Sequence, residues 1–403
     1  MNSRTDAFPF HSLLNTALLC FILAGSTGFL FRLSMVYPLS LGLNLANIRH
    51  AHSHLMFFGW AIPLPMIFIL RYLSVRTSSA IKPLKRIVGL LFFMAFVAYP
   101  FFLLFGYHPV PLPGKSLPVA AMLSGLIMLG WYAFIVYYMK ARRNMKSSPA
   151  LVFYDAALLM LALSSLGAWG VSLTQFFHAE SALLAQSMTH FFLTTFTEGW
   201  CVLSVLGVAY DVLEVEKTCI EPNRLVAPIV LGGPLMFPFG VSAGLLTPLL
   251  LWTARFGGLL VAAGLLLNLR ELLGREIGAW KWPLVFMALK VLMQLVAAVS
   301  PSAFWAGQPS LRILYLHTVL LGFFSLGLFT GLKFILSQIG PIRYRMIIAA
   351  VILLIASLLP LTRFWPHALS GAWIFTVVAV VALLPVVGAI PWLWSGRRDI
   401  VKY

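Results

Sequence analysis

The sequence is poor in charged residues: Asp, Glu, Lys and Arg make up only 10% of its 403 residues, and just 11 residues are acidic. Hydrophobic residues make up 61%, and the mean hydropathy is +0.95. A soluble globular domain carries roughly 25% charged residues, so this composition excludes that class. The apolar runs are about 20 residues long and do not alternate as barrel strands would, which predicts an all-α polytopic membrane protein.

Cysteine is also scarce, and its placement excludes a cysteine metal motif. The three cysteines, Cys20, Cys201 and Cys219, lie far apart in the sequence. Cys20 and Cys201 fall within apolar runs, where a small buried side chain is the expected role. The sequence contains no repeat, no low-complexity segment and no long linker, so residues 1–403 are expected to form a single polytopic membrane domain.

Twelve apolar segments are predicted to cross the membrane. They are residues 13–36, 50–71, 86–106, 117–139, 150–176, 186–210, 225–245, 248–269, 281–300, 311–336, 343–361 and 370–394. With the N-terminus placed inside, 21 of the 28 Lys and Arg residues fall in inner segments and four in outer loops. This asymmetry follows the positive-inside rule and predicts that both termini are cytoplasmic, in a bacterial-type inner membrane. The net charge of +17 is therefore attributed to topology, and no nucleic-acid partner is expected.

Histidines gather at the outer ends of three predicted spans. His50, His52 and His54 open the second span, His190 opens the sixth and His317 opens the tenth. All three spans run from outside to inside, so the imidazoles are expected at a similar depth. Side chains from different helices at one depth can converge on one ligand, which predicts a metal or haem site near the outer face.

The spacing of the first three histidines divides them into two groups. His50 and His54 are four residues apart and share a helix face, whereas His52 points roughly the other way. The three therefore cannot form one ligand set on a regular helix. A low-spin haem iron needs two axial imidazoles, usually from two helices, and one each from the second and tenth spans would supply them. The alternative for His52, His190 and His317 is a hydrogen-bonded packing role.

The segments around these histidines resemble the haem-copper oxidase superfamily, subunit I, which includes the bacterial nitric oxide reductases. The stretch Arg49-His-Ala-His52-Ser-His-Leu-Met resembles the Arg-x-x-His motif of the family, and it places His52 at the low-spin haem ligand. The stretch Tyr315-Leu-His317-Thr-Val-Leu-Leu-Gly-Phe323 resembles the His-x-His motif of the tenth span. On this resemblance His317 is the second low-spin ligand, and Tyr315 stands where the high-spin haem ligand is expected.

The resemblance is incomplete at the second metal of the family. The stretch Thr194-Thr-Phe-Thr-Glu198-Gly-Trp200 resembles the reductase pattern His-x-x-x-Glu-Gly, but Thr194 stands at the metal-binding histidine, with His190 one turn earlier. The seventh span carries no histidine, where the family has a His-His pair. A second metal, copper or iron, is therefore only weakly indicated. A looser similarity, through His50-Ala51-His52, is to membrane haem proteins of the nitric-oxide response.

Several further residues are candidates for the site. Arg49 and Arg312 lie at outer helix ends and are candidate partners of haem propionates, with interfacial snorkelling as the alternative. Tyr315 is a candidate iron ligand, with hydrogen bonding or packing as the alternative. Glu198 needs a partner within the membrane and is a candidate proton-relay group, or a metal ligand with His190. Lys290 is a candidate partner for a carboxylate, with the lining of a polar cavity as the alternative.

The sequence thus predicts a membrane haem protein of the haem-copper oxidase subunit I type, with a bis-histidine haem near the outer face. Its expected activity is electron transfer or reduction of a small diatomic or nitrogen oxide, and whether it is an oxidoreductase is left open. Expected partners are the lipid bilayer, a quinol or cytochrome, and a small gaseous ligand. His50, His54 and His190 are candidate ligands of a second metal. The alternatives are a non-enzymatic protein that responds to nitric oxide or handles haem or metal, and a transporter.

Overall fold

The computed structural model describes residues 10–37, 42–77, 81–177, 180–336 and 339–393. These residues are almost entirely helical, and eleven of their helices are long and apolar enough to cross a membrane. The predicted all-α membrane class is therefore confirmed. Which side the termini face stays a prediction, and four of the residues in the charge count, Arg4, Arg397, Arg398 and Lys402, lie outside the described residues.

The chain divides into two compact units, which are described separately. Unit 1 comprises Met1–Met145 and Leu332–Tyr403, and unit 2 comprises Lys146–Gly331. The expectation of one membrane domain stays a prediction.

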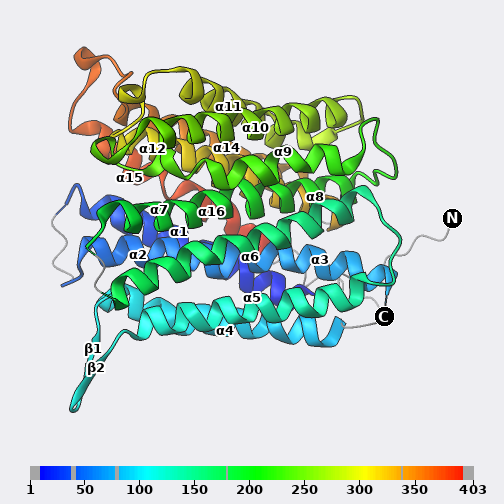
Figure 1. The fold of residues 1–403 in the computed structure, drawn as a ribbon, viewed down its shortest axis with the longest axis horizontal. Helices are drawn as coiled ribbons and strands as arrows, with labels where there is room; N and C mark the ends of the chain where they lie inside the picture. The colour runs from blue at the N-terminus through cyan, green and yellow to red at the C-terminus, as the bar shows by residue number, and fades with distance from the viewer. Residues whose placement is uncertain (1–9, 38–41, 78–80, 178–179, 337–338, 394–403) are drawn as a thin grey trace. The chain divides into compact units, whose positions relative to one another are not determined.

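Unit 1 contains helices from both ends of the chain (Figure 1). They are α1 (His11–Ser34), α2 (Leu45–Met56), α3 (Pro63–Arg76), α4 (Ile81–Phe105), α5 (Val119–Arg142), α14 (Pro341–Leu358), α15 (Trp373–Val381) and α16 (Leu384–Ala389). Strands β1 (Val110–Leu112) and β2 (Lys115–Leu117) pair antiparallel and form a hairpin that projects beyond the ends of α4 and α5. Its turn contains Gly114, whose φ of +78° is in the left-handed region that glycine adopts without strain.

Unit 2 is formed by one continuous stretch of chain. Its helices are α6 (Pro149–Phe176), α7 (Ala182–Thr194), α8 (Val202–Val212), α9 (Pro222–Leu235), α10 (Pro248–Leu273), α11 (Lys281–Val299) and α12 (Pro309–His317). Helix α13 (Leu326–Ile335) contains the boundary between the units. The core of unit 2 is apolar apart from a small set of buried polar side chains, which include Glu198, Lys290 and Gln294.

The second, sixth and tenth spans are each interrupted by a π-helical segment. These segments are Phe57–Ala61 between α2 and α3, Thr195–Cys201 between α7 and α8, and Thr318–Ser325 between α12 and α13. In the second span the cause is local, because Pro63 has no N–H and its ring disfavours a regular helix through the preceding turn. The N–H of Ile62 instead bonds the carbonyl of Phe57, five residues back, at 3.0 Å. Short π-helical segments inside α-helices occur frequently at functional sites.

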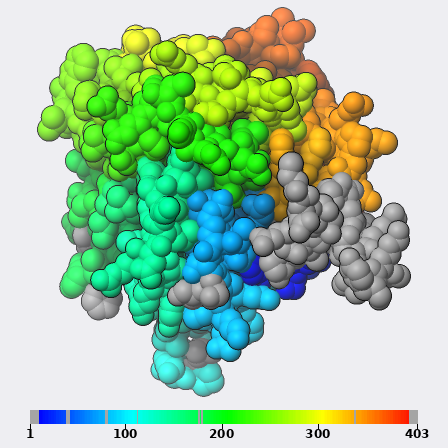
Figure 2. All heavy atoms as spheres, turned by 90° about the vertical axis from the view of Figure 1, so that its right-hand side faces the viewer, coloured from blue at the N-terminus to red at the C-terminus, as the bar shows by residue number. Residues whose placement is uncertain are grey.

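The segment predicted as the seventh span takes a different form from the other eleven. Helix α9 has only 14 residues and is followed by short 3₁₀ turns at Phe237–Gly240 and Ala243–Leu245. It packs closely on α10, because a Cβ atom on Gly232 would lie 2.6 Å from the carbonyl oxygen of Gly257. In Figure 2 the atoms of α9 and α10, coloured green to yellow-green, lie next to one another at the surface. Small residues allow such close backbone approach between membrane helices.

Candidate functional site

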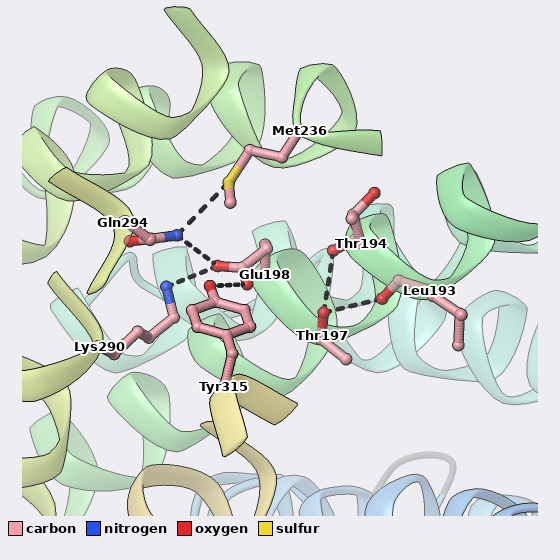
Figure 3. A network of polar contacts seen from close by, with 8 residues as sticks. All are labelled: Leu193, Thr194, Thr197, Glu198, Met236, Lys290, Gln294 and Tyr315. Carbon is pink, nitrogen blue, oxygen red and sulfur yellow. Dashed lines mark hydrogen bonds and ion pairs between the residues drawn. The ribbon is translucent and has the colours of Figure 1, made fainter. Parts of the chain in front are cut away.

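A cluster of polar side chains surrounds Glu198 inside unit 2 (Figure 3). Glu198 lies in the π-helical segment Thr195–Cys201 and is fully buried. Its Oε2 atom is 2.6 Å from Nζ of Lys290 and accepts a hydrogen bond from Nε2 of Gln294 at 3.1 Å. Its Oε1 atom accepts a hydrogen bond from the Tyr315 hydroxyl at 2.5 Å. Helix α11 supplies Lys290 and Gln294, and α12 supplies Tyr315.

The contacts of the cluster satisfy a carboxylate that would otherwise be very costly to bury. Lys290 and Glu198 are both 0% exposed, so neither charge of the ion pair is solvated by bulk water. A buried ion pair persists when hydrogen bonds satisfy its remaining lone pairs, and here Glu198 accepts two hydrogen bonds besides its ion pair with Lys290. The predicted pairing of Lys290 with a carboxylate is thus confirmed. The positive charge beside the Glu198 carboxylate is therefore that of Lys290.

Three buried polar atoms near Glu198 have no hydrogen-bond partner among the described residues. They are Oε1 of Gln294, Oγ1 of Thr195 and Nζ of Lys290, whose contact with Glu198 is an ion pair. The amide of Gln294 is itself oriented by its Nε2 atom, which contacts Sδ of Met236 at 3.4 Å as well as Glu198. Buried polar atoms in native proteins are usually satisfied, often by ordered water. A carboxyl group, an amine and a phenol in such close contact are groups that can hold a proton and exchange it with one another.

His52 lies on α2 in unit 1, with its ring against α1. Its Nδ1 atom is 2.7 Å from the backbone carbonyl of Ala24. Gly28, one turn further along α1, makes room for the imidazole, because a Cβ atom there would lie 2.8 Å from the ring. A carbonyl only accepts hydrogen bonds, so Nδ1 carries the proton and Nε2 carries the lone pair.

His317 has the same arrangement within unit 2. It is the last residue of α12, and its Nδ1 atom is 2.8 Å from the carbonyl of Ile313. Nδ1 is again the donor, so the lone pair is on Nε2. A neutral imidazole held in this tautomer by a carbonyl is the usual state of a metal-ligating histidine. The donor chemistry of both histidines therefore fits an axial haem ligand.

His50 and His54 lie on the other face of α2, as their spacing predicts. The His54 ring stacks on Phe102 with centroids 3.8 Å apart, and its Nε2 atom is 2.5 Å from the Tyr107 hydroxyl. The His50 ring lies 4.9 Å from the ring of Tyr107. Tyr107 lies outside the spans, and burial raises its pKa to about 12. The phenol is therefore protonated at neutral pH and donates to His54.

The remaining predicted residues occupy other places. The His190 ring packs against Gly240, and a guanidinium nitrogen of Arg312 donates to the Gly240 carbonyl at 2.8 Å. His190 is not among the contacts of Glu198 in the described part of the chain, and Arg49 is exposed. Within these residues no group of three or more His, Cys, Asp or Glu side chains gathers as a metal site.

Sequence reasoning missed several residues that shape the site. Gln294 carried a detectable signal, because it follows Lys290 by one helical turn within an apolar span. Tyr107 also carried a weak signal, as an aromatic residue just beyond the predicted third span. Ala24 and Gly28 carried none, since one contributes a backbone carbonyl and the other the absence of a side chain.

The sequence matches no protein-family model, and it matches none of the curated proteins with which it was compared. Its fold, however, is similar to that of a haem-copper terminal oxidase whose dimer was solved by cryo-electron microscopy. The TM-score is 0.71, the similarity covers 98% of this chain and 84% of that chain, and the sequence identity is 12%. This similarity does not test the nitric oxide reductase branch. The protein therefore has the all-α membrane fold of a haem-copper terminal oxidase.

Proposed function

We propose that the protein is a membrane redox protein that binds haem through His52 and His317. The observation that carries the proposal is the shared state of the two imidazoles. Each donates from Nδ1 to a backbone carbonyl, Ala24 for His52 and Ile313 for His317, which is the contact that usually orients a metal-ligating histidine. The similarity to an oxidase fold supports a redox role.

Other residues of the chain have proposed roles around the bound haem. Bound haem would supply one-electron chemistry. Arg49 and Arg312 are proposed to neutralise its propionates by charge. Tyr315 donates to Glu198, which supports hydrogen bonding rather than iron ligation as its role.

Glu198 is proposed as the proton-holding group. Reduction of a diatomic or nitrogen oxide consumes protons, and a quinol or cytochrome would supply the electrons. The hydrogen-bonded chain from Lys290 through Glu198 to Tyr315 offers a path along which a proton moves between neighbouring heavy atoms. Glu198 is central in this chain because it contacts both partners.

Visible spectra of the purified protein, oxidised and reduced, test this function. The wild-type protein is expected to show a Soret band and a sharp low-spin band on reduction. The double variant His52→Ala/His317→Ala is expected to lose both, because both proposed haem ligands are removed.

The exposed His367 provides a matched control, and His367→Ala is expected to leave the spectrum unchanged. A wild-type protein without a Soret band would overturn the proposal. So would a double variant with an unaltered spectrum.

A non-enzymatic role is the second candidate, and one contact favours it. Lys290 provides the cation beside Glu198, so this carboxylate is already paired within the protein. A protein that binds haem and nitric oxide without turnover would respond to the gas rather than reduce it. Gas consumption with a chemical reductant separates the two: sustained consumption supports the enzyme, and stoichiometric binding alone supports the responder.

A further inference from the structure

The charge of the protein is divided very unevenly between its two units. Unit 1 contains 19 of the 28 Lys and Arg residues and only two of the 11 acidic residues, so it carries the whole formal net charge of +17. Unit 2 contains nine basic and nine acidic residues and is formally neutral. Both units contain helices long and apolar enough to cross a membrane, so membrane crossing alone does not account for the difference.

The described part of unit 1 contains no carboxylate side chain for its cations. The two acidic residues of the unit, Asp6 and Asp399, both lie outside the described residues. In unit 2, by contrast, Lys290, Arg224 and Arg275 each lie within 4.0 Å of a carboxylate oxygen. A surface with one sign of charge attracts counter-ions from outside the chain. The excess of cations in unit 1 therefore favours the binding of an anionic group.

Three of these cations line a cavity at the C-terminal end of α5. The cavity has a volume of about 410 Å³ and is lined by Met139, Lys140, Arg142 and Arg143. This volume is within the range of about 300–1,000 Å³ that is usual for small-ligand sites. The guanidinium of Arg142 donates to the carbonyl of Met145 at 3.0 Å, and Nζ of Lys140 lies 4.9 Å from the centre of the Tyr137 ring. These contacts restrain two of the three cationic side chains.

The other charges at this end of α5 do not neutralise the cavity. Lys140 and Arg143 are exposed and have no acidic partner among the described residues. The end of a helix carries only about half a negative charge, which is less than the charge of three cations. A phosphate group accepts hydrogen bonds from both ammonium and guanidinium donors, so its chemistry fits this lining.

The apolar surface beside these cations favours a lipid as the source of the phosphate. Val136 and Met139 precede Lys140 and Arg143 by four residues each, so the four side chains share one face of α5. Val136 and Met139 are 52% and 57% exposed, as expected of side chains that contact acyl chains. Along this face apolar side chains are followed by cations, which is the order of acyl chain and headgroup in a phospholipid.

We propose that the cavity at the C-terminal end of α5 binds the phosphate of an anionic phospholipid. Lys140 and Arg143 contact the phosphate oxygens, and Val136 and Met139 contact the first part of an acyl chain. Unit 1 thus takes its counter-charge from the membrane, whereas unit 2 supplies its own carboxylates. The inference does not depend on haem binding.

The test is native mass spectrometry of the full-length protein in a neutral detergent with added phosphatidylglycerol or phosphatidylcholine. The wild-type protein is expected to bind phosphatidylglycerol more tightly than phosphatidylcholine. In Lys140→Gln/Arg143→Gln the apparent affinity for phosphatidylglycerol should fall about 30-fold, because each basic residue near an anionic lipid contributes a factor of about five. Glutamine favours the helix about as well as lysine and arginine do, so the exposed positions tolerate the change. Inorganic phosphate is expected not to displace the lipid, because it has no acyl chain.

Arg270→Gln/Lys281→Gln is the matched control. It removes two exposed cations from unit 2, and Lys281 lies over the ring of Trp282 much as Lys140 lies over Tyr137. Its affinity for phosphatidylglycerol is expected to match that of the wild type.

Four results would contradict the proposal. Equal affinity of the wild type for the two lipids would indicate another occupant, such as an acidic protein. Displacement of the lipid by inorganic phosphate would indicate a site for the free ion. An unchanged affinity in the test variant, or an equal loss in the control, would show that the cavity is not the site.

Discussion

Replacing Glu198 by alanine is expected to destabilise the protein by about 3–5 kcal/mol, the usual cost of removing one partner of a buried ion pair. The ammonium of Lys290 is 2.6 Å from this carboxylate and completely buried, so the variant would leave a charge in an apolar interior. Gln294 and Tyr315 would also lose the acceptor of their hydrogen bonds. A large fall in the thermal unfolding temperature in detergent is the expected result.

A double-mutant cycle shows whether the pair itself causes the loss. Lys290→Met alone leaves a buried carboxylate and should also destabilise, whereas Glu198→Leu/Lys290→Met removes both charges and should be less harmful than either single change. The exposed pair of Glu221 and Arg224, 3.6 Å apart, is the control, and Glu221→Ala should cost at most about 1 kcal/mol. If Glu198→Ala cost no more than this control, the described pairing would be wrong.

Placing a methyl group at Gly257 is expected to destabilise unit 2 by about 1–3 kcal/mol through overpacking. A Cβ atom there would lie 2.7 Å from the carbonyl oxygen of Gly232 and 2.8 Å from Cβ of Leu235. Backbone atoms cannot rotate away, so α9 would have to move from α10. Thermal unfolding of Gly257→Ala measures the effect.

Gly89 provides a control of the opposite sign. It lies within α4, and no atom outside its own helical turns comes within 4 Å of a Cβ atom built there. Gly89→Ala should therefore be neutral or should stabilise the protein by up to about 1 kcal/mol, because alanine favours the helix. Equal losses in the two variants would argue against close packing between α9 and α10.

Composition and hydropathy were enough to predict the class of the protein and most of its spans. Hydropathy is a sum over neighbouring residues, so eleven of the twelve predicted spans coincide with long apolar helices of the fold. Helical spacing is also local, and it correctly separated His52 from His50 and His54. The motifs around His52 and His317 pointed to a haem-copper oxidase type of fold, which the structural similarity confirms at the level of the fold. The sequence did not predict that α9 is short, because the prolines and glycines of this segment are compatible with both a span and a broken helix.

Which polar groups contact one another depends on the packing of helices that are distant in the sequence. Glu198 and Tyr315 are 117 residues apart in sequence, and Glu198 and Gln294 are 96 apart, so no local pattern could pair them. The π-helical segments likewise depend on how each span packs and on where its backbone bonds shift. The imidazole tautomers depend on backbone carbonyls, which every residue possesses and no sequence singles out. Composition places such a chain in a membrane because burial of apolar surface is additive, whereas a site depends on single contacts between distant residues.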